Sequence, residues 1–288
     1  MRLYRRFFSA VFAMLLLVLA VVPASGTTNW EEVADKYFEA VVNERPLPLL
    51  PEVQPEYRNA ENAYKVQKLL FEKLLARNGD SIAGFKAGVT APAQMQRFGS
   101  EIPASAPLFK SGLVEISDPS QPVKIRPFKG IMLETELAFK TAAPVTAPVK
   151  DEAELKSLVA SIHACIEVPQ VYFEDMDKVK FFDLTAAGIG SRVFLVGPPV
   201  QPVSLDPDQV TVKLTHNGAP VNEGRGTEAL GGQWKALLWL VNNTVAQGYS
   251  IPAGQYLLTG ALGRMIPAPS GTYEADFSFG PLLFEVAE

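Results

Sequence analysis

The spacing of hydrophobic residues predicts two helices before the first strand. From Trp30 onwards, apolar side chains recur three and four residues apart, which is the spacing of one face of an amphipathic helix. The members of this run are Trp30, Val33, Ala34, Tyr37, Phe38, Val41 and Val42. A proline-rich segment separates it from a second predicted helix over 59–77, which ends at Asn78 and Gly79. We therefore expect a small helical N-terminal part.

The remainder of the chain alternates short strands with turns. An apolar run over 130–139, bounded by proline before it and by a Thr/Ala/Pro-rich segment after it, predicts a single strand. Further strands are expected at 164–169, 192–196, 210–215, 256–261, 275–279 and 282–286, with a hairpin turn at Asn217 and Gly218. Helices are expected over 151–163 and 228–247. Because strands outnumber helices, the sequence predicts an α+β sandwich or roll.

The composition is typical of a protein that is stabilised by packing alone. The chain has 288 residues, of which 48% are hydrophobic, and this is enough for one large domain with a smaller N-terminal part. Cys165 is the only cysteine, so no intramolecular disulfide can form, and we expect this residue to be buried. Because His163 and His216 are the only histidines, a histidine-based zinc site or a Ser-His-Asp triad is a poor interpretation.

The first 26 residues have the pattern of an export signal. Three arginines precede an apolar run over 7–22, and 23–26 supplies small residues for cleavage. The alternative is an uncleaved membrane anchor, for which a run of 16 residues followed by proline is short. Cleavage would remove three arginines and no acid, lowering the formal net charge from −5 to −8. We expect a periplasmic protein with no nucleic-acid partner and no membrane partner after cleavage.

Two glutamates interrupt the apolar strand at 130–139. Residues two apart on a strand face the same side, so Glu134 and Glu136 would project together, about 7 Å apart at the backbone. A third carboxylate, Glu167, stands in the apolar segment 164–169 and would complete a three-carboxylate site. A hard divalent cation such as Mg²⁺ or Mn²⁺ prefers such oxygen ligands. The alternative is an edge strand with a solvated acidic face.

A lysine flanked by glycines precedes this strand. Gly84 and Gly88 flank Lys86 at alternate-residue spacing, where glycine allows the backbone to approach a ligand closely and the ammonium group could meet an anion. The alternative is a surface lysine that belongs to a turn.

Six segments together resemble one enzyme family. They include Gly-Phe-Lys-Ala-Gly-Val-Thr at 84–90, Leu-Glu-Thr-Glu-Leu-Ala-Phe at 133–139 and Leu-Thr-Gly at 258–260, with the others at 63–67, 166–167 and 226–240. In this order they resemble the 2-keto-4-pentenoate hydratase branch of the fumarylacetoacetate hydrolase superfamily. The resemblance extends from about residue 60 to the C-terminus.

This resemblance implies a mixed β-sandwich roll, with a helical N-terminal part at 27–80 and a catalytic domain at 81–288. It implies Mg²⁺ or Mn²⁺ held by Glu134, Glu136 and Glu167, a small 2-oxo acid as substrate, and a homo-oligomer. The catalytic residue it implies is Lys86, and the substrate-binding residues are Gly84, Gly88, Thr259 and Gly260.

The chain departs from the family pattern around the metal ligands. Hydratases usually carry an acid a few positions after the third metal ligand, where this chain has Val-Pro-Gln at 168–170. They tend to carry polar residues where it has Ala-Ala-Gly at 186–188. They often have a His-Pro pair where it has Gly-Gln-Trp at 232–234. Three functions therefore stay open. The first is a metal-dependent lyase acting on a 2-oxo acid, with hydration favoured over decarboxylation. The second is an exported binder of metal and oxo acid without turnover. The third, a hydrolase of carbon–carbon bonds, is disfavoured because it needs a general base that the site region lacks.

The signal pattern gives a first testable prediction. We expect the chain purified from its native host to begin near residues 24–26, because signal peptidase cleaves after small residues that follow an apolar run. Intact-mass measurement of the native protein tests this expectation. Recovery of a chain that still carries Met1, in a cytoplasmic fraction, would contradict it.

Overall fold

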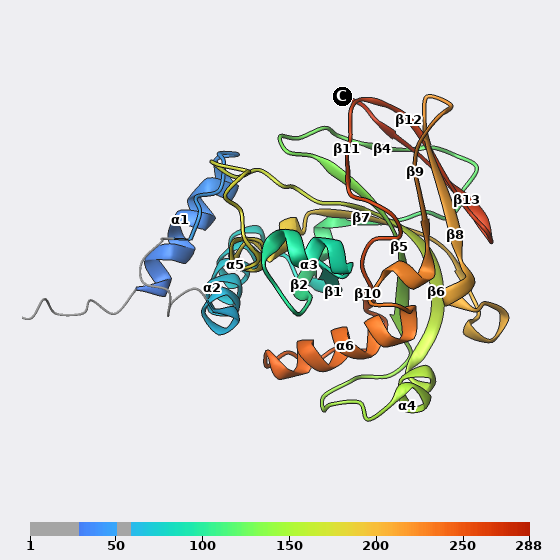
Figure 1. Ribbon diagram of the computed structural model, residues 1–288, viewed down its shortest axis with the longest axis horizontal. Helices are drawn as coiled ribbons and strands as arrows, with labels where there is room; N and C mark the ends of the chain where they lie inside the picture. The colour runs from blue at the N-terminus through green and yellow to red at the C-terminus, as the bar shows by residue number, and fades with distance from the viewer. Residues whose placement is uncertain (1–28, 51–58) are drawn as a thin grey trace, which may run out of the picture.

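The computed structural model describes residues 29–50 and 59–288, so the signal predicted for 1–26 lies outside the described part of the chain (Figure 1). The helices are α1 (Trp30–Val42), α2 (Ala60–Asn78), α3 (Pro92–Phe98), α4 (Glu152–Ser157), α5 (Phe181–Ala186) and α6 (Gln233–Ala246). The strands are β1 (Ile82–Gly88), β2 (Ala104–Phe109), β3 (Leu113–Glu115), β4 (Val123–Ile125), β5 (Met132–Thr141), β6 (Val159–Val168), β7 (Val193–Val200), β8 (Thr211–His216), β9 (Ala219–Arg225), β10 (Tyr256–Leu258), β11 (Ile266–Pro267), β12 (Gly271–Phe277) and β13 (Gly280–Val286).

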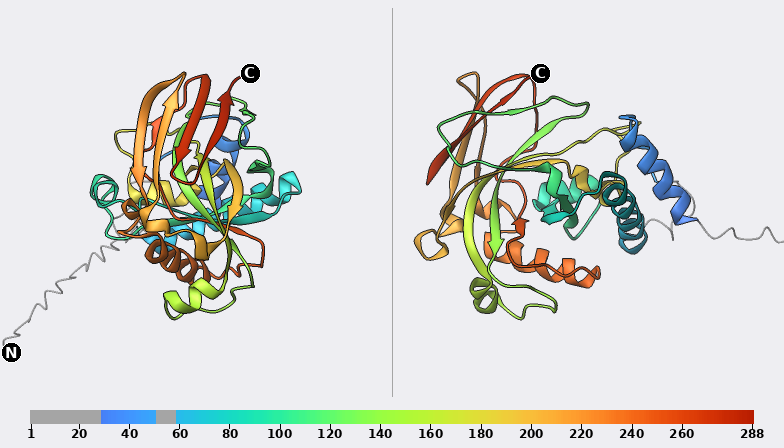
Figure 2. Two further views of the ribbon diagram at one scale, coloured as in Figure 1. Left: turned by 90° about the vertical axis from the view of Figure 1, so that its right-hand side faces the viewer. Right: turned by 180° about the vertical axis from the view of Figure 1, so that it is seen from behind.

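Two sheets form the body of the molecule. The larger sheet has the order β2-β1-β10-β5-β6-β7-β3, and the short strand β11 also pairs with β5. The smaller sheet has the order β4-β13-β12-β8-β9. It lies at the opposite end of the molecule from α1 and α2 (Figures 1 and 2). The predicted hairpin is confirmed as β8 and β9, which turn at Asn217 and Gly218.

The alternation of residues along β5 divides its two faces. Leu133, Leu137 and Phe139 enter the main hydrophobic core, to which both sheets and α6 contribute. Residues at even positions from 134 to 140 point to the other face, which carries the acidic pair. Because β5 pairs with β10 on one side and β6 on the other, it is an inner strand. The edge-strand interpretation of the acidic pair is therefore wrong.

The two predicted N-terminal helices are confirmed with their boundaries. The Asn29 side chain accepts hydrogen bonds from the first-turn amides of α1, and the Asn59 side chain caps α2 in the same way. Gly79 ends α2 in the left-handed conformation, with φ of 60°. Both helices pack with α5 in a second hydrophobic cluster, separate from the main core.

The helix predicted over 151–163 is wrong beyond its first two turns. Asp151 caps α4, which ends at Ser157, and β6 begins at Val159. From Ile162 onwards, residues at even positions enter the main core while those at odd positions face away, which is the period of a strand. Pairing with both β5 and β7 then fixes this segment as an inner strand.

The helix predicted over 228–247 begins later than expected. Leu230 and Gly231 have positive φ angles of 51° and 81°, which no helix tolerates, so α6 starts at Gln233. The segments that form α3, α5 and β2 to β4 were not predicted, since they are short or lack a clear period.

The predicted fold class is confirmed as a mixed α+β structure built on curled sheets. In the described part of the chain, no helix has the length and apolar character needed to cross a membrane.

The parallel pairing of β1 with β10 gives a stability prediction. A Cβ atom on Gly84 would lie 1.8 Å from the carbonyl oxygen of Tyr256, which is rigid backbone. We expect Gly84→Ala to reduce the free energy of unfolding by about 3 kcal/mol, because a strand must move to relieve this overlap. Urea denaturation measures the effect.

Gly79→Ala is the matched control for this substitution. Gly79 has φ of +60° and no atom within 4 Å of its Cβ position, so the change costs only the left-handed backbone, about 1 kcal/mol. Equal destabilisation by the two variants would contradict the proposed role of Gly84 in strand packing.

Candidate metal and substrate site

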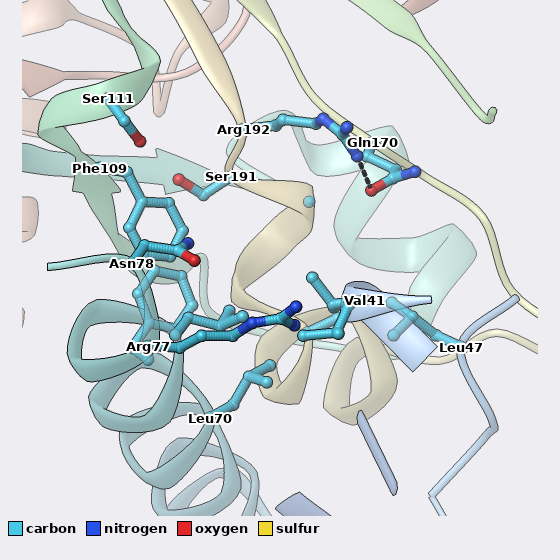
Figure 3. Close-up of a pocket in the computed structure, with 15 residues that line it drawn as sticks. Val41, Leu47, Leu70, Arg77, Asn78, Phe109, Ser111, Gln170, Ser191 and Arg192 are labelled. Carbon is cyan, nitrogen blue, oxygen red and sulfur yellow. Dashed lines mark hydrogen bonds between the residues drawn. The ribbon is translucent and has the colours of Figure 1, made fainter. Parts of the chain in front are cut away.

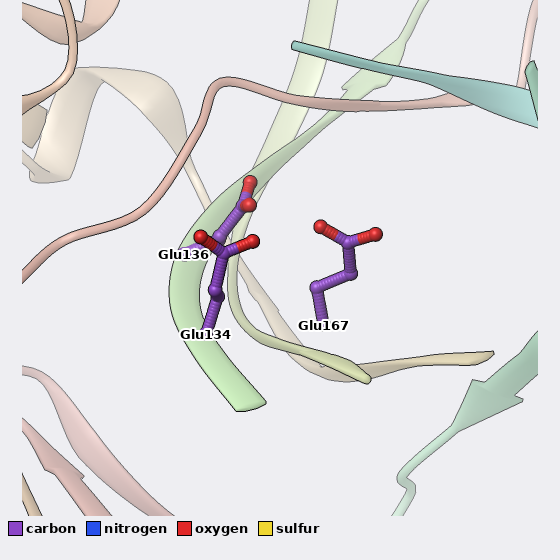
Figure 4. A group of neighbouring side chains, drawn as sticks. All are labelled: Glu134, Glu136 and Glu167. Atoms are coloured by element: carbon purple, nitrogen blue, oxygen red, sulfur yellow. The ribbon is translucent and has the colours of Figure 1, made fainter. Parts of the chain in front are cut away.

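The pairing of β5 with β6 brings the three predicted carboxylates together. Glu134 is the register partner of Glu167, and Glu136 follows on the same face of β5. One carboxylate oxygen from each residue lies within 4.8 Å of the other two. Figure 4 shows the three side chains gathered in one place. Residues 33 positions apart in the sequence thus form one cluster, as predicted.

Two oxygens of this cluster are buried without a hydrogen-bond partner. Glu136 and Glu167 have no exposed surface, and among residues 29–50 and 59–288 no hydrogen-bond donor contacts Oε1 of Glu136 or Oε2 of Glu167. The other oxygen of Glu136 accepts a hydrogen bond of 2.9 Å from the backbone N–H of Gly260. Because buried unpaired carboxylate oxygens are costly, their number and direction fit a bound divalent cation.

The electrostatics of the metal-free cluster also indicate crowding of like charge. Burial raises the pKa of Glu134 to about 7, the charge on Glu167 acts in the same direction, and Lys86 opposes both. Burial, followed by the charges of Glu167 and Glu134, holds the pKa of Glu136 well above its ordinary value. A cation between the carboxylates would remove this repulsion.

Lys86 lies in the same buried site. Its side chain is 1% exposed, so the interpretation as a surface lysine in a turn is wrong. The ammonium group forms an ion pair with Oε1 of Glu167 and donates a hydrogen bond of 3.0 Å to the carbonyl oxygen of Ile189. Lys86 therefore reaches a carboxylate of the cluster from β1, which is separated from β5 by β10 in the sheet.

The partner carbonyl of Lys86 comes from an unusual piece of backbone. Ile189 has φ of +52°, between Gly188 at +65° and Gly190 at +68°. A β-branched residue in this conformation is strained, and such strain is found where the surrounding structure holds a functional geometry. The sequence offered no sign of this residue beyond the two flanking glycines.

The four predicted substrate-binding residues have different surroundings. Gly84 makes room for the backbone of Tyr256, and Gly88 faces the side chain of Ile189, so both glycines have a packing role. Gly260 orients Glu136 through its N–H group. Thr259 is fully buried, and its hydroxyl donates to Oε1 of Gln233. Contact of any of these residues with substrate stays a prediction.

Gln233 is a site residue that the sequence argument missed. Its side chain is fully buried and also donates a hydrogen bond of 2.7 Å to the carbonyl of Gly226. It thereby ties the start of α6 to the Thr259–Gly260 turn, which holds Glu136. The only signal in the sequence was its position, where the family often has a His-Pro pair.

A cavity of about 400 Å³ is lined in part by Ala187, Gly190 and Ser191 (Figure 3). Residues of α1 and α2 line it together with Phe109, Ser191 and Arg192. Arg192 donates a hydrogen bond of 2.6 Å to Gln170 at its rim. Neither Lys86 nor any of the three glutamates lines this cavity, so it is distinct from the carboxylate cluster.

Comparison with curated proteins identifies the family. The chain is 33% identical over 247 residues to 2-keto-4-pentenoate hydratase of Paraburkholderia phymatum, covering 85% of this chain and 92% of that protein. It is 32% identical over 219 residues to the enzyme of the same name from Burkholderia vietnamiensis, covering 75% and 82% of the two chains. No family model matches the sequence.

Solved structures give the same fold. A 4-oxalocrotonate decarboxylase from Pseudomonas putida G7, complexed with magnesium and adipate, superposes with a TM-score of 0.78 at 21% identity, covering 90% of this chain and 97% of that one. A fumarylpyruvate hydrolase from Pseudomonas aeruginosa, in complex with Mn²⁺ and pyruvate, superposes with a TM-score of 0.55 at 14% identity, covering 70% and 88%. The fold is that of the fumarylacetoacetate hydrolase superfamily. The chain belongs to its 2-keto-4-pentenoate hydratase branch.

The buried cluster predicts the effect of removing one carboxylate. We expect Glu136→Gln to lower the affinity for Mn²⁺ by ~10² or more, since even loss of a group that only orients a ligand costs 10- to 100-fold. The metal-free variant should be more stable than the wild type. Calorimetric titration with Mn²⁺, and urea denaturation in the presence of a chelator, measure the two effects.

The gain in stability should depend on pH. The pKa of Glu136 is higher in the folded chain than its ordinary value of 4.5, which we take for the unfolded chain. Such a carboxyl group stabilises the fold most at pH values below 4.5, and this stabilisation is lost as the pH rises through the folded pKa. The variant escapes this loss, so its advantage should be small at pH 4.5 and larger at pH 8. Glu274→Gln, at an exposed strand position, is the control. Unchanged Mn²⁺ affinity in Glu136→Gln would place the metal elsewhere.

Proposed function

We propose that the protein is a metal-dependent hydro-lyase that adds water to a 2-keto-4-pentenoate-type substrate. The observation that carries the proposal is the convergence of three carboxylates and one lysine in a buried site. Membership of the hydratase branch supplies the reaction class. The substrate would be a small 2-oxo acid in its dienol form.

Glu134, Glu136 and Glu167 would hold one Mg²⁺ or Mn²⁺. Two of their oxygens have no hydrogen-bond partner in the described part of the chain, which supports this assignment. When bound, the cation would supply Lewis-acid stabilisation of negative charge on the 2-oxo group. The N–H group of Gly260 fixes one oxygen of Glu136, leaving its other oxygen available as a ligand.

Lys86 would carry the proton. Hydration of the dienol requires loss of the 2-hydroxyl proton and addition of a proton at the terminal carbon C5. Water then adds to the remaining double bond, placing its hydroxyl on C4 and a proton on C3. The ammonium group is buried, contacts Glu167 and is fixed by the carbonyl of Ile189, so it is directed into the site. A positioned donor of this kind contributes about 10²- to 10⁴-fold to rate.

Decarboxylation is the second candidate function. The observation that favours it is the likeness to the 4-oxalocrotonate decarboxylase structure over nearly the whole of both chains. Both reactions need charge stabilised on a 2-oxo group, and they differ in whether water adds or a carboxylate leaves as CO₂. Incubation with 2-hydroxypenta-2,4-dienoate and, separately, with 4-oxalocrotonate separates them. The hydratase proposal expects loss of diene absorbance with the first and no CO₂ from the second.

Export and a homo-oligomeric state complete the proposal. The signal pattern supports export. The alternative to an exported enzyme is an exported protein that binds metal and oxo acid without turnover. If the protein binds oxalate through the metal but turns over neither substrate, the lyase proposal fails and the non-catalytic binder takes its place. Light scattering of the purified chain measures the oligomeric state.

Lys86→Met tests the role of the lysine. The substitution keeps the stem and removes the charge, so we expect turnover of 2-hydroxypenta-2,4-dienoate to fall by ~10² or more while Mn²⁺ still binds. Because Lys86 neutralises buried Glu167, the metal-free variant should lose stability, by roughly 3 kcal/mol. Saturating Mn²⁺ should recover most of it.

Lys213→Met is the matched control. Lys213 occupies an exposed position on β8, so the same change in chemistry should leave turnover and stability nearly unaltered. Steady-state kinetics and thermal denaturation with and without Mn²⁺ give the comparison. Full turnover in metal-loaded Lys86→Met would show that the lysine only neutralises Glu167.

A further inference from the structure

A second polar cluster lies on the same sheet face as the carboxylates. Ser161, His163, Cys165 and Glu167 are successive residues on one face of β6, because they are two apart. Glu167 belongs to the metal site at one end, and Ser161 and His163 lie toward the other. Between them Cys165 is buried in a small apolar cluster with residues of β1, β2, β5, β7 and β10.

Ser161 and His163 form a directed hydrogen-bonded pair. Oγ of Ser161 lies 2.8 Å from Nε2 of His163, and Nδ1 of His163 lies 2.8 Å from the carbonyl oxygen of Gly197. A carbonyl can only accept, so Nδ1 carries the proton. In the neutral ring Nε2 is then the acceptor, and the Ser161 hydroxyl donates to it. This is the arrangement of a nucleophile, a base and a group that orients the base.

An interruption of the β6–β7 ladder makes the carbonyl available. Pro198 and Pro199 follow Gly197 on β7 and have no N–H group to donate to β6. The register shifts between His163 and Cys165 at this point. Such irregularities redirect groups beside functional sites, and here the Gly197 carbonyl meets an imidazole.

The pair opens into a cavity of about 340 Å³. Ser161 and His163 line it with Lys140, which is the register partner of Ser161 on β5. The Lys140 ammonium donates a hydrogen bond of 3.1 Å to the hydroxyl of Tyr256 and lies 3.7 Å from Glu115. Lys140 thus lies on the strand beside the serine, and it lines the same cavity together with its partner Glu115. Its ammonium group would stabilise negative charge on a carbonyl oxygen bound in this cavity.

The charges around His163 support a neutral base. Burial lowers the pKa of His163, and Lys140 lowers it further, while the Gly197 hydrogen bond and Glu115 act in the opposite direction. The ring of Tyr256 packs edge-on against the imidazole, with centroids 5.4 Å apart. These contacts leave His163 unprotonated at neutral pH and hold the ring in place.

We propose that Ser161 and His163 form a second reactive site, a nucleophile and its base that accept the acyl group of a small ester. This activity is separate from the proposed hydration, and the metal ligands take no part in it. The cavity sets the size of the acyl group, and its apolar walls include Ile116, Val196 and the two prolines.

The reaction balances with groups on the page and water. Oγ of Ser161 attacks the ester carbonyl as its proton passes to Nε2 of His163, and Lys140 faces the oxygen that gains charge. The carbon–oxygen bond to the alcohol then breaks, and the alcohol leaves with the proton from His163. Water, activated by the same nitrogen, next cleaves the acyl-serine and restores the hydroxyl.

A fluorophosphonate tests the proposal because it reacts covalently with activated serines. We expect incorporation of one phosphonyl group per chain, which peptide mass spectrometry assigns to Ser161. Ser161→Ala and His163→Gln should each reduce labelling at least tenfold, and hydrolysis of 4-nitrophenyl acetate should fall in parallel. Ser117→Ala is the matched control, since Ser117 lines the same cavity, and it should label like the wild type.

The wild-type result decides the question even if a variant fails to fold. Absence of labelling in the folded wild type, or labelling at Ser117 or another residue, overturns the proposal. The outcome is independent of the proposed hydration, because Ser161→Ala should keep its Mn²⁺ affinity and its turnover of 2-hydroxypenta-2,4-dienoate. If the wild type is labelled at Ser161 but does not hydrate 2-hydroxypenta-2,4-dienoate, the proposed function is wrong and the Ser161–His163 proposal is unaffected.

Discussion

The antiparallel pairing of β5 with β6 is the constraint on which the rest of the site depends. It places Glu134 opposite Glu167 and sets Glu136 beside them. A slip of β5 by one residue would turn Glu134 and Glu136 toward the main core and separate them from Glu167 on β6. The core prevents that slip, because Leu133 and Leu137 fill it from the opposite face. The packing that stabilises the fold is thus the same packing that sets the register of the site. An inner strand can carry such crowded acids only where something positive compensates, and in the metal-free chain that group is Lys86.

Local patterns predicted much of the fold. Helix α1 was predicted because its apolar residues repeat at helical spacing, and the end of α2 was predicted because Asn78 and Gly79 stop a helix. The segment 151–163 was misread because Asp151 begins a real but short helix, and the strand that follows it is defined by pairing with β5 and β7. The alternation of Ser161, His163 and Glu167 with apolar residues is the period of a strand, but no proline or glycine marks where the helix ends and the strand begins. The late start of α6 has a similar cause, since Leu230 adopts a positive φ that its residue type does not announce.

The site was predicted in the same uneven way. The three glutamates stood out because charge in an apolar strand needs a reason, and Lys86 stood out because of its flanking glycines. The groups that hold these four side chains in place could not be recognised from the sequence. Ile189 contributes a backbone carbonyl, and Gln233 contributes an amide that matters only through its contacts with Thr259 and Gly226. The pairing of Ser161 with His163 was equally hidden, since it depends on the carbonyl that the interrupted ladder at Gly197 leaves free.

The contact of Phe71 with Gly188 has a consequence for how this chain can change. Phe71 on α2 stacks on Phe109 and occupies the space where any side chain at residue 188 would stand, directly before the Ile189 carbonyl that fixes Lys86. Gln67, one helical turn earlier, donates hydrogen bonds to the carbonyls of Thr185 and Ser105. The N-terminal helices are therefore no interchangeable module. A chimera that took this helical part from a relative would have to change the 185–190 segment at the same time to keep Lys86 in position. The same holds for a lineage in which the helical part diverged.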